Sequence, residues 1–163
     1  MDNNILLVYY SFEGNTEYVA RKLAETIDIK RTIRLHPLSE PPHEGIKKFA
    51  IGGKSALRHE KVGLQQIELN YDEYDTIFIA CPVWAATYPP AVGEFLDTYP
   101  FKNKKVYFIG CSAGGNAYGM MNKLSRKILG DYSGNSIVAS LSLKSPLKNR
   151  EETDRKIRDF CSW

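Results

Sequence analysis

A short polar segment, residues 11–16 (Ser-Phe-Glu-Gly-Asn-Thr), has the residue types that bind phosphate groups. It follows an apolar run at 5–10 and precedes apolar residues at helical spacing. Unpaired backbone N–H groups and the helix dipole favour an anion at such a point. Gly14 permits close backbone approach, and the loop offers three side-chain donors: Ser11, Asn15 and Thr16. The alternative interpretation is a plain turn in which Asn15 or Thr16 caps the helix.

The loop carries no lysine or arginine, so any phosphate would be held by neutral donors alone. It matches neither the P-loop pattern GxxxxGK[ST] nor the dinucleotide pattern GxGxxG. Elsewhere, the three histidines lie outside the candidate loops, and Ser11 lacks the GxSxG context of a nucleophile. Acyl-transfer chemistry is therefore not indicated.

The elements that would position this loop alternate between strand and helix. Strands are predicted at 5–10, 29–35, 76–81, 105–110 and 136–143. Helices are predicted at 18–27, at 43–61 with a bend at Gly52-Gly53, after Pro89-Pro90, at 120–129 and at 149–161. Apolar strands that alternate with helices predict a parallel sheet covered on both faces. In such sheets the ligand lies at the carboxyl ends of the strands.

Three segments follow predicted strands and carry unusual residues: residues 10–16 with their Gly-Asn-Thr ending, Cys81-Pro82-Val83-Trp84 with the helix behind it, and residues 110–116 (Gly-Cys-Ser-Ala-Gly-Gly-Asn). Together they resemble the loops of the flavodoxin family. The resemblance covers essentially the whole chain. It implies a three-layer α/β/α fold whose five-stranded parallel sheet has the order 2-1-3-4-5, one flavodoxin-like domain over residues 1–163, and FMN as the cofactor.

The same resemblance implies the cofactor-binding residues. They come from the phosphate loop and the two loops at the flavin ring: Ser11, Phe12, Glu13, Gly14, Asn15, Thr16, Pro82, Val83, Trp84, Ala85, Ser112, Gly114, Gly115, Asn116 and Tyr118. Trp84 would stack on the flavin, with Tyr118 or Tyr88 as a second wall. The alternative for Trp84 is a core residue that closes the end of the sheet. No catalytic acid or base and no metal ligand are expected.

Two features depart from the family pattern. Many flavodoxins have glycine in the ring loop, where a peptide flip stabilises the one-electron-reduced flavin, whereas this chain has Ala85-Ala86-Thr87. A positive φ costs about 1 kcal/mol more at alanine than at glycine, so we expect weaker stabilisation here. Flavodoxins are also typically acidic, whereas this chain has a net charge of +3. Residues 62–100 hold six acidic residues and no lysine or arginine, which predicts a local acidic rim beside the ring loop.

The first functional hypothesis is an FMN protein that transfers electrons through its flavin between redox partners. The alternative is an FMN-dependent NAD(P)H oxidoreductase that acts on a quinone, a flavin or another small acceptor, and a domain that has lost FMN and serves in protein interaction is a third. The partners would be redox proteins or a small electron donor or acceptor, and the chain would be a monomer or a dimer.

Composition limits the other classes. The chain has 163 residues, 43% of them hydrophobic, and no apolar run approaches the ~20 residues of a membrane span. The weak positive charge does not indicate nucleic-acid binding. Three cysteines without CxxC or zinc spacing, and no signal-peptide pattern, predict a reduced, cytoplasmic protein. Cys81 and Cys111 end neighbouring strands, either as buried apolar residues or as a redox pair.

Overall fold

The computed structural model describes residues 4–40, 61–130 and 133–162. Five parallel strands form one sheet in the order β2-β1-β3-β4-β5, which confirms the predicted fold class. The strands are β1 (Ile5–Tyr9), β2 (Arg31–Arg34), β3 (Thr76–Pro82), β4 (Lys105–Ser112) and β5 (Ser136–Lys144). The helices are α1 (Asn15–Ile27), α3 (Pro90–Thr98), α4 (Tyr118–Ile128) and α5 (Arg150–Phe160), with a 3₁₀ turn η1 (Tyr71–Glu73) before β3.

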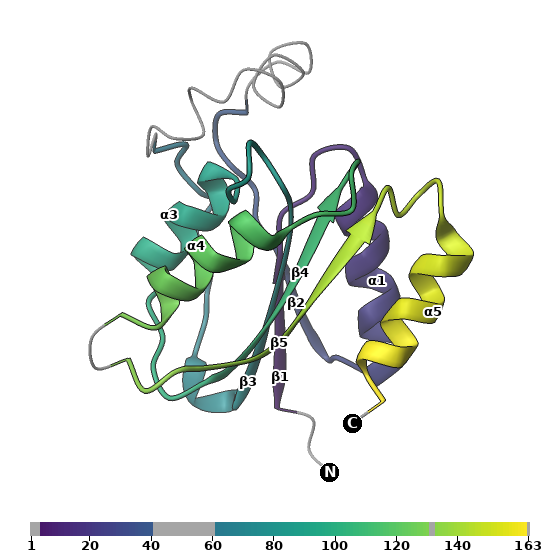
Figure 1. Ribbon diagram of the computed structural model, residues 1–163. Coiled ribbons are helices and arrows are strands. Elements are labelled where there is room, and N and C mark those ends of the chain that lie inside the picture. The colour runs from purple at the N-terminus through teal and green to yellow at the C-terminus, as the bar shows by residue number, and fades with distance from the viewer. Residues whose placement is uncertain (1–3, 41–60, 131–132, 163) are drawn as a thin grey trace.

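The sheet is the middle of three layers. Helices α1 and α5 cover one face and α3 and α4 cover the other (Figure 1). Alternate residues of each central strand serve the two faces: Leu6 and Val8 of β1 belong to the core under α3 and α4, and Leu7 belongs to the core under α1 and α5. Strand β1 is buried at all five positions, which explains its unbroken apolar sequence.

The outer strands differ from the central ones because each has a neighbour on one side only. Strand β2 is shorter than the predicted 29–35, although Ile29 and Leu35 on either side of it are buried. Strand β5 alternates between exposed and half-buried residues, as its sequence predicts, and its pairing with β4 shifts register at Val106/Tyr107. The helix expected at 43–61 lies outside the described residues except for Lys61.

No helix in the described ranges is both long enough and apolar enough to cross a membrane. Nor do the described residues contain a group of three or more His, Cys, Asp or Glu side chains placed to hold a metal ion.

Candidate functional site

A cleft opens where β1, β3, β4 and β5 end, and it is named here the carboxyl-end cleft. Its volume is about 390 Å³, within the ~300–1,000 Å³ typical of small-molecule sites. The loops after all four strands line it. Nine of the residues predicted from the sequence line it: Ser11, Phe12, Glu13, Asn15, Thr16, Pro82, Val83, Trp84 and Ser112.

The loop after β1 brings two hydroxyl groups into this cleft. Ser11 is 3% exposed and Thr16 is 1% exposed, yet neither hydroxyl has an oxygen or nitrogen hydrogen-bond partner among the described residues. The polar group beside the Thr16 hydroxyl is the Cys111 thiol, which is only a weak hydrogen-bonding partner. Buried polar groups are nearly always paired, and an unpaired one costs roughly 1–3 kcal/mol. Two such hydroxyls beside a helix N-terminus are therefore what a loop that holds a phosphate group would show without its ligand.

The start of α1 differs from the plain-turn alternative. Gly14, not Asn15 or Thr16, occupies the N-cap position, and no side chain caps the helix. Its φ of 88° lies in the left-handed region, where glycine has no steric penalty. The Asn15 amide oxygen instead accepts a hydrogen bond of 3.0 Å from the backbone N–H of Leu147. Asn15 thus ties the first loop to the loop after β5.

The ring loop forms a tight backbone turn. Trp84 and Thr87 exchange two backbone hydrogen bonds of 2.9 Å, which closes a two-residue turn over Ala85 and Ala86. Both alanines have positive φ, 48° and 58°. The paired ends of the turn impose this conformation despite its steric cost at alanine. The expected weaker stabilisation of the one-electron-reduced flavin stays a prediction.

Helix α4 packs directly onto this turn. A Cβ atom added at Gly119 would lie 2.9 Å from the Ala86 carbonyl oxygen and 3.0 Å from its Cβ. Glycine is therefore needed at this position by contact rather than by φ. Similarly, a Cβ at Gly110 of β4 would collide with the Cβ of Ala117, so the start of α4 lies close against the sheet.

Trp84 fits both of its proposed roles. It is 8% exposed and packs edge-on against Tyr10 and Phe12, with ring centroids 5.7 and 6.2 Å away. It thus belongs to the core and also lines the carboxyl-end cleft. The two candidates for a second aromatic wall, Tyr88 and Tyr118, do not line the cleft, and Tyr118 is 76% exposed.

The loop after β4 lines the cleft only at its start. Cys111, Ser112 and Ala113 line it, whereas four other predicted residues do not: Gly114, Gly115, Asn116 and Tyr118. Ala85 and Gly14 also lie outside the lining. Asn116 has a structural role, since its amide oxygen accepts a hydrogen bond of 3.0 Å from the Tyr118 N–H at the start of α4.

One wall of the cleft is not predicted by the sequence, and it is named here the fourth wall. Residues 145–148, which follow β5, all line the cleft. No motif in the sequence marks them, and the only available signal was that β5 should also end at this edge of the sheet. Ser145 has a φ of 41° and Lys148 is exposed. Lys148 and Glu13 are the only charged residues in the described lining.

The predicted acidic rim is not part of this lining. The Glu94 carboxylate accepts backbone hydrogen bonds from Val62 (2.7 Å) and Gly63 (3.0 Å), which lie beside α3 rather than the cleft. Asp97 forms an ion pair of 2.5 Å with Lys127. Both acidic groups therefore serve local packing of α3.

The two strand-end cysteines face opposite layers. Cys81 belongs to the core under α3 and α4, and Cys111 belongs to the core under α1 and α5. Side chains on opposite faces cannot form a disulfide, and both thiols are free. Burial raises the pKa of the Cys111 thiol to about 12, although the neighbouring Thr16 hydroxyl acts in the opposite direction. Burial likewise raises the pKa of Cys81. Both are buried, neutral thiols, and the redox-pair interpretation is wrong.

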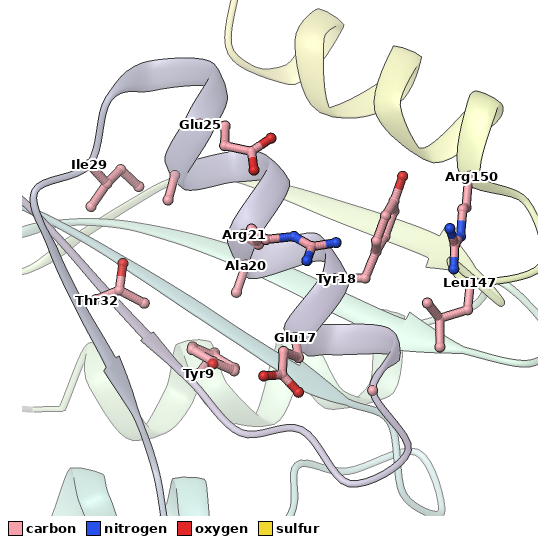
Figure 2. A pocket seen from close by; sticks show the side chains of 12 residues that line it. Tyr9, Glu17, Tyr18, Ala20, Arg21, Glu25, Ile29, Thr32, Leu147 and Arg150 are labelled. Carbon is pink, nitrogen blue, oxygen red and sulfur yellow. The ribbon is translucent and has the colours of Figure 1, made fainter.

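A second, larger cavity of about 690 Å³ runs along α1 and is named here the α1 cavity (Figure 2). The ring of Tyr18 lies between the guanidinium groups of Arg21 and Arg150, 5.8 and 5.3 Å from its centroid. The Tyr18 hydroxyl donates a hydrogen bond of 2.7 Å to Asp154, and Glu17 pairs with Arg34 at 2.9 Å. Gly14 lines this cavity, and Leu147 lines both cavities.

Comparisons with known proteins bear on the carboxyl-end cleft. A family model described as Flavodoxin matches residues 4–138. Among curated proteins, none matches this sequence. Among solved structures, a candidate flavoprotein from Bacteroides uniformis is 20% identical with a TM-score of 0.74, and the match covers 96% of this chain and 98% of that one.

Two further structures are similar over almost their whole length. A flavoprotein in complex with FMN from Lactobacillus acidophilus is 18% identical, with a TM-score of 0.60 and coverage of 91% of this chain and 97% of that one. The oxidised Flavodoxin 2 from Bacillus cereus is also 18% identical, with a TM-score of 0.61 and coverage of 96% and 94%. At these identities the similarity establishes the shared fold.

Proposed function

Because the chain belongs to the flavodoxin family, we propose that it binds FMN in the carboxyl-end cleft and transfers electrons through the bound flavin. The observation that carries this proposal is the pair of buried hydroxyls, Ser11 and Thr16, which have no oxygen or nitrogen partner among the described residues at the N-terminus of α1. The complex of the Lactobacillus acidophilus flavoprotein with FMN supports the choice of cofactor.

The chain's own residues would divide the work of binding. Ser11 and Thr16 would donate hydrogen bonds to phosphate oxygens, together with the free backbone N–H groups of the first turn of α1. Trp84 would offer a flat apolar wall at the other side of the cleft. FMN, when bound, supplies the redox chemistry, and the protein supplies position, exclusion of water and electrostatic environment.

The competing hypothesis is an FMN-dependent NAD(P)H oxidoreductase. In the described lining, Glu13 and Lys148 are the two exposed titratable residues, and Cys111 is buried and neutral. This lining supports a protein whose chemistry rests on the flavin itself, since the residues would position the ring and set its surroundings. We therefore propose electron transfer, with partner proteins or a small electron donor or acceptor on either side.

The test is a titration of the apo-protein with FMN, followed by flavin fluorescence, with riboflavin as the control without phosphate. Saturable quenching by FMN and much weaker quenching by riboflavin is the expected result. Absence of binding by both flavins would contradict the proposal. Mixing the FMN complex with NADH or NADPH then separates the two hypotheses, because rapid bleaching of the flavin absorbance would favour the oxidoreductase.

A further inference from the structure

The loop after β5 carries a charge that the phosphate loop lacks. We propose that the ammonium group of Lys148 offsets the charge of the FMN phosphate in the carboxyl-end cleft. This inference rests on the proposed FMN function. Residues 11–16 contain no lysine or arginine. In the described lining Lys148 is the only basic residue, and it enters from a segment more than a hundred residues away.

A set of hydrogen bonds holds Lys148 in this place. The Asn15 amide oxygen accepts from the Leu147 N–H at 3.0 Å, which fixes the residue before Lys148 against the first residue of α1. The Lys148 N–H donates to the Ser145 carbonyl at 2.9 Å, and the Asn149 amide donates to the Lys144 carbonyl, also at 2.9 Å. The backbone on both sides of Lys148 is therefore tied down beside the phosphate loop.

The charges of the cleft need such a cation. A phosphate monoester carries roughly −1.5 to −2 charges near neutral pH, and Glu13, also in the lining, adds repulsion. No carboxylate of the described residues forms an ion pair with Lys148, so its ammonium group is available to a ligand. The neutral hydroxyls of Ser11 and Thr16 would fix the position of the phosphate, and Lys148 would offset its charge.

This division of roles has a measurable signature. Hydrogen bonds from buried hydroxyls depend little on salt, whereas attraction by an exposed lysine is screened. Part of the preference for FMN over riboflavin should therefore disappear at high ionic strength. The salt-sensitive part of the FMN preference should be lost when the charge of Lys148 is removed.

The experiment measures dissociation constants of FMN and riboflavin at ~0.02 M and ~0.5 M salt. The proteins are the wild type, Lys148→Gln, Lys148→Arg and a matched control, Lys105→Gln. Lys105 is also exposed, but it opens β4 at the opposite end of the sheet. At low salt we expect Lys148→Gln to weaken FMN binding ~5-fold to ~10-fold. Its riboflavin affinity should stay within ~2-fold, and at high salt its FMN affinity should approach that of the wild type.

The other variants decide between charge and packing. Lys148→Arg should keep near-wild-type FMN affinity because it keeps the charge, and Lys105→Gln should not change it. Equal FMN affinities for Lys148→Gln and Lys105→Gln would overturn the inference while leaving the proposed function intact. A loss in Lys148→Arg as large as in Lys148→Gln would also overturn it, since packing would then be the cause. A wild type that binds neither flavin would overturn the proposed function and this inference with it.

Discussion

The carboxyl-end cleft and the α1 cavity differ in which polar groups are left without partners. The α1 cavity is larger, about 690 Å³ against 390 Å³, yet its Glu17 and Tyr18 already bond to Arg34 and Asp154. The smaller cleft holds two buried hydroxyls without an oxygen or nitrogen partner in the described residues. Volume alone would select the α1 cavity, whereas unsatisfied polar chemistry selects the cleft. In this molecule, buried polar groups without partners are therefore a better sign of a ligand site than cavity volume.

The largest expected effect comes from the wall of the carboxyl-end cleft. Trp84→Ala should destabilise the apo-protein by about 3–5 kcal/mol, because a buried aromatic side chain is lost. It should also weaken FMN and riboflavin equally, since the ring site and not the phosphate site is changed. Urea unfolding and flavin titration measure the two effects. Trp84→Phe is the folded control, and unchanged flavin affinity in Trp84→Phe and Trp84→Ala would remove Trp84 from the ring site.

The next effect concerns the unpartnered hydroxyls. Thr16→Val keeps the shape of the side chain and removes its hydroxyl, so FMN binding should weaken ~10-fold to ~100-fold, the loss of a hydrogen bond to a charged group. Riboflavin affinity should not change. The apo-protein should be as stable as the wild type or more stable, because a buried unpaired hydroxyl is gone. A less stable apo-protein with unchanged FMN affinity would show that the hydroxyl serves the fold.

A smaller effect is expected where α4 meets the ring loop. Gly119→Ala should lower the free energy of unfolding by about 1–2 kcal/mol, since the new methyl group meets Ala86 at 2.9–3.0 Å and overpacking outweighs the better helix propensity of alanine. Both flavins should bind more weakly. Gly114→Ala is the matched control, because a Cβ there meets nothing within 4 Å. Equal stability of the two variants would contradict the close packing of α4 on the turn.

The smallest effect on flavin binding should come from the α1 cavity. Replacing Arg21 and Arg150 together by glutamine should change FMN affinity by less than ~2-fold and stability by about 1–2 kcal/mol, the size of two cation–π contacts. Flavin titration and urea unfolding check both values. A large loss of FMN affinity in this double variant would contradict the assignment of the flavin site to the carboxyl-end cleft alone, since the α1 cavity would then be part of that site.

The central strands could be predicted from the sequence because burial on both faces requires a continuous apolar run, which is visible in each segment by itself. A parallel strand that is buried on both faces must be apolar throughout, so the runs at 5–10 and 76–81 mark β1 and β3 directly. The prediction of 29–35 for edge strand β2 is too long, because Ile29 and Leu35 are apolar and buried although they lie outside the strand. The Leu35 N–H still donates a hydrogen bond of 2.8 Å to the Tyr9 carbonyl of β1.

The candidate site could be predicted only in part, for the opposite reason. Its first loop has a recognisable order of residues, but the approach of Leu147 to Asn15 joins positions 132 residues apart. Nothing in the sequence of residues 145–148 marks that contact. The left-handed Ala85 and Ala86 were also beyond prediction, since alanine disfavours this conformation and the backbone bonds between Trp84 and Thr87 impose it.

The fourth wall of the cleft, residues 145–148, makes ligand binding depend on the folded state. The carboxyl-end cleft draws its lining from Ser11 through Lys148, so it exists only when β1 and the segment after β5 have reached the same edge of the sheet. A ligand that fits this cleft binds the native state and not the unfolded chain. By mass action, free FMN at 100 times its dissociation constant would add about 2.7 kcal/mol to the free energy of unfolding. Bound FMN would then slow proteolysis of this chain, because proteases cleave the transiently opened state whose population the ligand lowers.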